Sequence, residues 1–185
     1  MTVSTVLEKL RDALDATGIP YLVSGSFASA AHGIPRATND IDIVIAPSRQ
    51  QLEQLLARLA KSDFATDLED PFDAFVRNSL FNIVDFKTLW KIDFIFKQPT
   101  EFDASRFSRR TVVDIAGVHL YAATAEDILI TKLWWAKLGE SERQINDAAG
   151  IIQVQGETLD VEYVNRWVEA LELQAQWTNA QKRAS

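Results

Sequence analysis

The spacing of apolar residues switches between helical and strand periodicity along the chain, and that order constrains the fold more than any other feature. Apolar residues recur three and four positions apart over 5–18 and 48–59, and again from Thr124 onward. Short apolar or alternating runs, typical of strands, lie between these segments. The predicted strands are 21–23, 41–45, 81–86 and 90–96, with weaker candidates at 111–115 and 118–121.

This order predicts an α/β (α+β) fold, a mixed β-sheet flanked by helices with a helical C-terminal section. We expect one structural domain, in which residues 1–123 form the core and residues 124–185 form helices packed on it. The stretch 62–79 is acidic and irregular, and we expect a loop there. Periodicity fades after Gln174, so the last residues are expected to fray.

Composition excludes several classes of protein. The 185 residues contain no cysteine, which rules out disulfides, thiolate metal sites and a cysteine nucleophile. No apolar run approaches the roughly 20 residues of a membrane-spanning helix, and the N-terminus does not resemble a secretory signal, so we expect a cytoplasmic protein. The net charge of −7 argues against a general polyanion-binding surface. A local basic patch at Arg106, Arg109 and Arg110, or simply a solvated stretch beside a strand, remains open.

Asp40 and Asp42 are the first residues that suggest chemistry. They lie two apart at the start of an apolar strand, so both carboxylates point to one face while Ile41 and Ile43 point to the other. Two carboxylates a few ångströms apart repel each other unless a cation neutralises them. Mg²⁺ suits this role, because it prefers hard oxygen ligands and keeps positions for phosphate oxygens.

Gly25 and Ser26 lie between an apolar strand and a helix-compatible run. A glycine there lets the backbone approach a ligand, and a serine hydroxyl with the first helical N–H groups can hold a phosphate. The alternative is that Ser26 only caps the helix.

A third carboxylate is needed from a later strand, and two residues compete for the role. Asp93 lies on the less apolar face of 90–96. An acid within such an apolar strand needs a partner, and a metal shared with Asp40 and Asp42 would be one. Asp85 is the rival, since it sits near the end of the preceding strand and can equally terminate it. The longer alternating pattern around Asp93 favours Asp93.

Taken together, these parts resemble the nucleotidyltransferase fold of the DNA polymerase β superfamily. Within it, the segment 36–42 (RATNDID) is similar to minimal and AbiEii-type bacterial members, which include toxins of toxin–antitoxin pairs. Segment 132–136 (KLWWA) is similar to a family Lys-x-x-x-Ala segment, and 143–147 (RQIND) matches a later segment loosely. The spacer before Asp40 is long, and Asn146 stands where a basic residue is usual.

The resemblance implies roles for individual residues. Asp40, Asp42 and Asp93 would be the catalytic carboxylates and the ligands of two Mg²⁺ ions, with Asp93 placed to take the acceptor's proton. A nucleoside triphosphate would be the substrate. The residues that would bind it are Gly25, Ser26, Arg36 and Lys132. Lys132 lies among apolar residues, where it needs an anion such as a triphosphate or else snorkels at a helix edge.

Several functional alternatives follow. The acceptor hydroxyl can belong to an RNA end, a protein or a small molecule such as an aminoglycoside, and the resemblance to AbiEii-type members implies an antitoxin as a candidate partner. The same carboxylates would also serve a metal-dependent phosphohydrolase. A further alternative is a non-catalytic binding protein that keeps the fold and has lost the chemistry. Arg143 and Asp147 have the spacing of a helical ion pair, and His32 has the position of a helix-end residue. The five tryptophans are predicted to be core, and the alternative for Trp134 and Trp135 is that they help to stack a base.

Overall fold

The computed structural model describes residues 2–66 and 70–185, and its centre is a seven-stranded mixed sheet. The strand order is β3-β4-β5-β2-β1-β7-β6. The strands are β1 Tyr21–Val23, β2 Asp40–Ile45, β3 Phe64–Thr66, β4 Leu80–Asp85, β5 Lys91–Phe96, β6 Thr111–Ile115 and β7 Val118–Ala122. The helices are α1 Val3–Thr17, α2 Gly25–His32, α3 Arg49–Leu59, α4 Pro71–Arg77, α5 Glu101–Arg109, α6 Ala125–Gly139, α7 Glu142–Gln155, α8 Val161–Ala170 and α9 Gln174–Ala184, with a short 3₁₀ turn, η1, at Gly156–Thr158. The predicted fold class, a mixed sheet with helices, is confirmed.

Strand register brings two distant segments together at the centre of the sheet. β2 and β5 run parallel, and Asp42 is the register partner of Asp93. β4 pairs antiparallel with β5 and places Asn82 beside Asp93. Ile41, Ile43 and Ile45 are fully or almost fully buried on the opposite face. The alternation of Ile and Asp along β2 therefore gives one core face and one polar face, as the sequence predicts.

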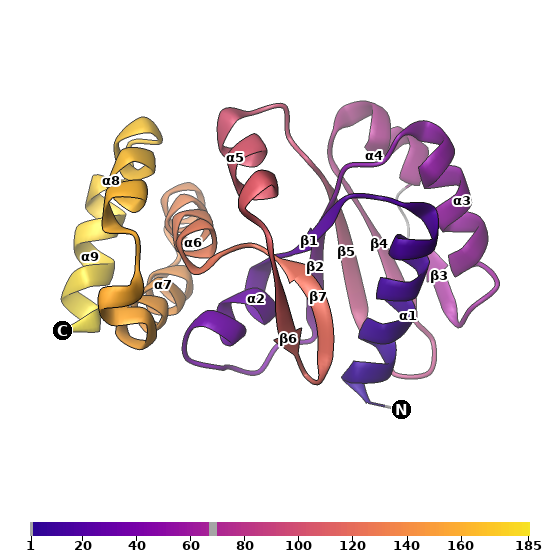
Figure 1. Ribbon diagram of the computed structural model, residues 1–185, viewed down its shortest axis with the longest axis horizontal. Coiled ribbons are helices and arrows are strands. Elements are labelled where there is room, and N and C mark those ends of the chain that lie inside the picture. Colours follow the sequence, from indigo (N-terminus) through magenta and orange to yellow (C-terminus); the bar gives the residue numbers. More distant parts are fainter. Residues whose placement is uncertain (1, 67–69) are drawn as a thin grey trace.

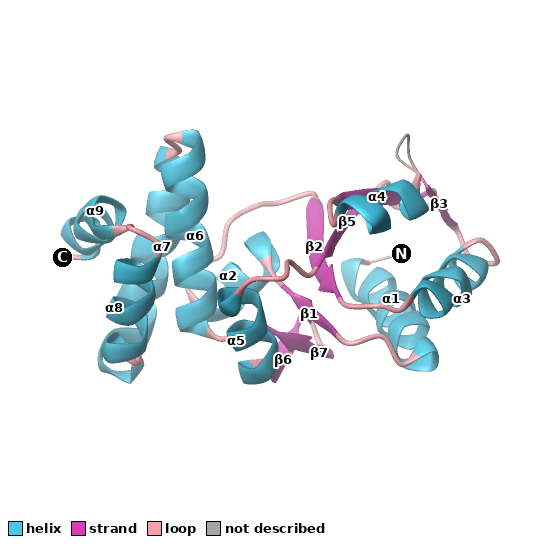
Figure 2. Cartoon of the chain, turned by 90° about the horizontal axis from the view of Figure 1, so that it is seen from above, coloured by secondary structure: helices cyan, strands magenta, loops and turns pink. Residues whose placement is uncertain are grey.

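Most of the helices lie at the two ends of the molecule, with α2 and α5 between them. Figures 1 and 2 both place α1 and α3 beside each other at one end of the sheet and α6–α9 at the other, next to the C-terminus. Helix α2 contacts β2 on one side and both α6 and α7 on the other. The turn that begins α2 therefore lies where the sheet meets the helical C-terminal section.

A buried polar network fixes the C-terminal helices to α5. The Asp127 carboxylate on α6 is fully buried, and it accepts a hydrogen bond of 2.6 Å from the Tyr163 hydroxyl on α8. Burial raises the pKa of Asp127, although bonds from Tyr163 and Thr124 oppose that effect. Burial and the Asp127 charge raise the pKa of Tyr163 to about 12. Ser105 on α5 also bonds the Tyr163 hydroxyl, so the network joins three helices.

Three segments differ from the sequence predictions. The expected loop 62–79 contains β3 and α4, although its residues 67–69 lie outside those described. Helix α5, not expected, begins at a Thr100 cap that accepts from the Asp103 N–H. The C-terminal segment does not fray: α9 packs on α7 and buries Trp177 and Ala180.

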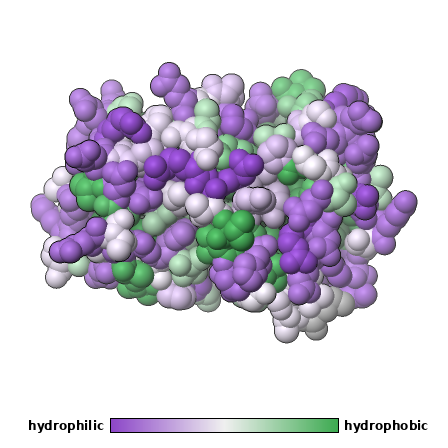
Figure 3. Space-filling model, in the orientation of Figure 1, coloured by the Kyte–Doolittle hydropathy of each residue, from purple (hydrophilic) through white to green (hydrophobic). Residues whose placement is uncertain are grey.

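The face of the molecule seen in Figure 3 is mainly hydrophilic. In the view of Figure 3, an apolar patch lies over β6 and β7, where Val112 and Tyr121 are exposed register partners. Among the helices described, none combines the length and apolarity that crossing a bilayer requires.

Candidate active site

Gly25 begins α2 directly against the second aspartate of β2. Its φ is +58°, a left-handed conformation that favours glycine. A Cβ atom built on Gly25 would lie 1.8 Å from Asp42 Oδ2. The backbone holds this approach, because the Ser24 N–H donates to the Asp42 carbonyl at 2.9 Å and the Ser26 N–H to the Asp42 carboxylate. Only glycine lets the turn pack this closely on a carboxylate.

Gly25→Ala is therefore expected to destabilise the protein by about 1–2 kcal/mol from the left-handed backbone alone. Displacement of the Asp42 side chain adds to that cost. Urea unfolding measures the change, with Gly139→Ala as the control, since a Cβ at Gly139 meets nothing within 4 Å. Equal stability of the Gly25 variant and wild type would contradict the close packing.

The three predicted carboxylates share one face of the sheet. Asp42 and Asp93 are side by side in register, and Asp40 is two residues before Asp42 on the same strand. Burial raises the pKa of Asp42, and the charges of Asp93 and Asp40 raise it further. The Lys132 charge and the Ser26 N–H act in the opposite direction without cancelling the rise. Asp42 is thus a buried carboxylate with two further carboxylates beside it.

Two neighbours contact Asp93 directly. The Lys91 ammonium lies 3.1 Å from its Oδ1, and the Asn82 side-chain amide donates to the same oxygen. Within residues 2–66 and 70–185, no three acidic or imidazole side chains are gathered as a ready set of metal ligands. Lys91 therefore supplies the positive charge beside this carboxylate, and its flexible side chain can move aside for another cation.

Asp85 lies on the other face of the sheet. It alternates with Phe81 and Ile83, is fully buried, and accepts hydrogen bonds from Thr88 in the turn after β4. Its Oδ1 is 3.9 Å from the Lys9 ammonium on α1. Asp85 terminates a strand and does not face Asp42, so of the two rivals only Asp93 lies beside the β2 aspartates.

Two cations line the other side of the Gly25 turn, and one carboxylate holds both. Arg36 donates from Nε to Asp147 at 2.9 Å, and its Nη2 donates to the Ser26 hydroxyl. Lys132, only 3% exposed, lies 2.8 Å from the same carboxylate. Ser26 does not cap α2, because the helix begins at Gly25 and no side-chain cap bond forms there. Arg36 therefore contacts the serine predicted to cradle phosphate, and Lys132 shares its carboxylate partner.

Charge and burial oppose each other in this cluster. Burial lowers the pKa of Lys132, while its bond to Asp147 raises it. Burial alone would raise the pKa of Asp147, but the hydrogen bonds from Arg36 and Lys132 outweigh it and lower that pKa. The anion that buried Lys132 needs is thus supplied within the chain, and the snorkelling interpretation of Lys132 is wrong.

Sequence reasoning missed Asp147 as a site residue and assigned it to a helical pair with Arg143. The signal was buried Lys132 itself, since an ammonium in an apolar stripe needs a partner. Asn82 and Lys91 were also missed, although Asn82 is the register partner of Asp93 and Lys91 lies two residues before Asp93 on the same strand. His32 is held by the Ala123 carbonyl at 2.8 Å, in agreement with its prediction as a helix-end residue.

Of the two alternatives left open for Arg106, Arg109 and Arg110, the local basic patch does not form. Arg106 is 8% exposed and lies 2.8 Å from Asp103, and Arg109 pairs with Glu126. Arg110 donates to the Phe107 carbonyl. These arginines belong to α5 and its C-terminal end, and their guanidinium groups are paired with acidic side chains or bonded to a backbone carbonyl.

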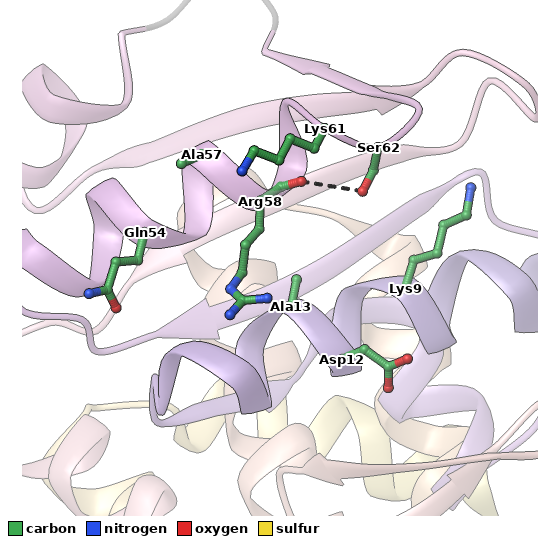
Figure 4. A pocket seen from close by; sticks show the side chains of 8 residues that line it. All are labelled: Lys9, Asp12, Ala13, Gln54, Ala57, Arg58, Lys61 and Ser62. Atoms are coloured by element: carbon green, nitrogen blue, oxygen red, sulfur yellow. Dashed lines mark hydrogen bonds between the residues drawn. The ribbon is translucent and has the colours of Figure 1, made fainter.

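A separate hollow lies between α1 and α3, away from the carboxylates. Figure 4 shows its lining, which includes Lys9, Asp12, Arg58 and Lys61. Lys9 pairs with Asp63 at 2.7 Å. None of its lining residues belongs to the candidate site.

Comparison with known proteins identifies the fold. No protein-family model and no curated protein sequence matches the chain. Solved structures do: ANT(2'')-Ia in complex with adenylyl-2''-tobramycin is 16% identical with a TM-score of 0.66, over 93% of this chain and 98% of that one. A nucleotidyltransferase-like protein from Paracoccidioides brasiliensis is 20% identical with a TM-score of 0.59, over 97% and 91%. The lincosamide antibiotic adenylyltransferase LnuA, lincomycin-bound, is 11% identical with a TM-score of 0.57, over 80% and 95%. The chain therefore has the nucleotidyltransferase fold.

Proposed function

We propose that this protein is a Mg²⁺-dependent nucleotidyltransferase that moves a nucleoside monophosphate from a nucleoside triphosphate to a hydroxyl group. The observation that carries the proposal is the register of Asp42 with Asp93 beside the Gly25 turn. The cations Arg36 and Lys132 lie on the other side of that turn. A cluster of carboxylates on one side of a turn, with phosphate-binding cations on the other, suits the metal-assisted transfer of a phosphoryl group.

The donor set fits Mg²⁺. Asp40, Asp42 and Asp93 offer hard oxygen ligands on one face, and burial together with the charges of Asp93 and Asp40 raises the pKa of Asp42. These three residues would hold the metal once the Lys91 ammonium moves from Asp93. Bound Mg²⁺ supplies charge neutralisation for the triphosphate and for the reacting oxygens.

The chain's own residues then have distinct tasks. The Ser26 hydroxyl, Arg36 and Lys132 bind the outer phosphates, with Asp147 holding the two cations in place. Asp93 accepts the proton of the acceptor hydroxyl. The acceptor oxygen forms a bond to the α-phosphorus, the bond from that phosphorus to the oxygen that bridges it to the β-phosphorus breaks, and pyrophosphate leaves. Positioning of this kind accounts for much of catalysis in phosphoryl transfer.

The acceptor is a small molecule, a protein or an RNA end. A small molecule is favoured by likeness in fold to ANT(2'')-Ia, solved with adenylyl-2''-tobramycin, and to LnuA, solved with lincomycin. We further propose that residues 1–123 carry the carboxylates and residues 124–185 complete the phosphate site, in a cytoplasmic enzyme. An AbiEii-type toxin with an antitoxin partner is the corresponding proposal for a protein or RNA acceptor.

The test incubates the protein with each labelled triphosphate, Mg²⁺ and candidate acceptors, including an aminoglycoside, and analyses products by mass spectrometry. We expect an acceptor increased by one nucleoside monophosphate, together with pyrophosphate. Free phosphate without an adduct would instead indicate a phosphohydrolase. Mass spectrometry of cellular RNA and protein after overexpression extends the search for the acceptor.

A non-catalytic binding protein is the second candidate, favoured by the Lys91–Asp93 ion pair beside the proposed metal ligands. Melting curves with and without Mg²⁺ and triphosphate address it, because a ligand that binds only the native state raises the melting temperature. A shift with triphosphate and no product with any acceptor class would favour binding alone.

A further inference from the structure

Two tryptophans on α6 are exposed, contrary to their prediction as core. Trp134 is 36% exposed and Trp135 is 54% exposed. Trp135 follows Lys132 by three positions, so both project from the same side of α6, one turn apart. Trp134 projects about 100° away from Trp135 around the helix and further from Lys132. Trp135 therefore continues the phosphate-binding side of α6 into solvent.

Helix α7 continues the same surface. Lys132 meets Asp147 across the α6–α7 hairpin, so the turn of α6 that carries Trp135 and the turn of α7 that carries Arg143 are the next ones towards the hairpin loop. Arg143 is exposed and makes no hydrogen bond or ion pair with any residue that the structure describes. The opposite side of this turn of α7 is covered, because Arg183 of α9 bonds both Asn146 and Glu142.

We propose that Trp135 stacks on the base of the nucleoside triphosphate whose phosphates lie on Arg36 and Lys132, with Arg143 beside it. The proposal rests on the proposed function and identifies the residue that binds the base. A flat indole face and a guanidinium both bind aromatic heterocycles well. An exposed tryptophan next to a phosphate cradle has an apolar surface that a base would cover. A polycationic acceptor, by contrast, would be repelled by Arg143.

The experiment measures binding of ATP and of inorganic tripolyphosphate, each with Mg²⁺, by calorimetry. Trp135→Ala is expected to weaken ATP binding about tenfold, the scale of one base–aromatic stack, and to leave tripolyphosphate binding unchanged. Trp134→Ala is the matched control and should match wild type for both ligands. Quenching of tryptophan fluorescence by ATP should fall in the Trp135 variant and persist in the Trp134 variant.

The outcomes separate this inference from the proposed function. Equal ATP affinity in Trp135→Ala and wild type overturns the stacking role and leaves the transferase intact. Equal loss of ATP and tripolyphosphate binding also overturns it, because the effect would then lie on the phosphates. A wild-type protein that binds neither ligand overturns both. Capture of a protein partner through Trp135, with ATP binding unchanged, would mark a docking surface instead.

Discussion

Asp42→Asn is expected to abolish nucleotidyl transfer while making the metal-free protein more stable. Loss of one charged metal ligand removes several kcal/mol of transition-state stabilisation, which corresponds to a rate lower by about a thousandfold or more. The free energy of unfolding of the variant should be higher than that of wild type, because in wild type burial and the charges of Asp93 and Asp40 raise the pKa of Asp42. The ionised carboxylate is therefore unfavourable in the folded protein, and asparagine removes that cost.

The pH dependence follows from the sign of this shift. The folded protein binds the Asp42 proton more tightly than the unfolded chain does, so the stability due to Asp42 falls as pH rises from 3.8 to its folded pKa. Above that window the cost is complete. The stabilising effect of Asp42→Asn should thus be largest at neutral pH and vanish below pH 3.8, where both forms are neutral.

Two measurements check the prediction for Asp42. Thermal melting in the presence of a chelator should give a higher midpoint for the variant than for wild type at pH 7, and a smaller difference between the two at pH 4. Each kcal/mol of added stability should raise the midpoint by about 2–4 °C. Product analysis should show no adduct. Asp15→Asn, on the exposed side of α1, is the activity control. Unchanged turnover in Asp42→Asn would refute the assigned role, and a lower melting midpoint would refute the unfavourable charge.

Apolar periodicity predicted the central strands well because burial dictates it. Ile41, Ile43 and Ile45 had to share one face, and that requirement places Asp40 and Asp42 on the other. Helices with little apolar surface were harder to predict. Helix α5 has a Thr100 cap and an acidic first turn, but only Phe102 and Phe107 are apolar and large, so its periodicity was weak. Helix α9 was missed for the same reason, since Trp177 is its one large apolar side chain.

Site residues that are neighbours along one strand could be predicted from the sequence. Contacts between residues of distant elements could not. The pairing of Asp42 with Asp93 depends on β5 adding parallel to β2, a choice that no local pattern fixes. Arg36 and Asp147 are 111 positions apart and meet only because α2 packs on the α6–α7 hairpin. The sequence showed that Lys132 needed an anion, but the hairpin that supplies Asp147 comes from tertiary packing.

Asp147→Asn is expected to destabilise the protein by about 3–5 kcal/mol, the cost of leaving buried charges without their partner. The Asp147 side chain is 8% exposed, and the Lys132 side chain that it binds is only 4% exposed. Arg36 loses the same partner but is 29% exposed, so most of the cost belongs to Lys132. Chemical denaturation at pH 7 measures the change. Asp12→Asn, which breaks an exposed pair with Arg11, should change stability by less than about 1 kcal/mol.

The origin of that cost is testable by pH and by a second substitution. Burial lowers the pKa of Lys132, and removing Asp147 lowers it further, so the folded variant releases this proton more readily than the unfolded chain. The stability of the Asp147→Asn variant should then rise with pH up to 10.5, and its loss of stability relative to wild type should shrink.

Lys132→Met in the Asp147→Asn background removes the unpaired ammonium at similar volume and should restore much of the lost stability. If the double variant is as unstable as the single one, the cost lies in Arg36 or in packing, and Asp147 does not serve chiefly to hold Lys132. Because the double variant lacks Lys132, it should still bind triphosphate poorly, which separates the stability of the cluster from its proposed role in holding phosphate.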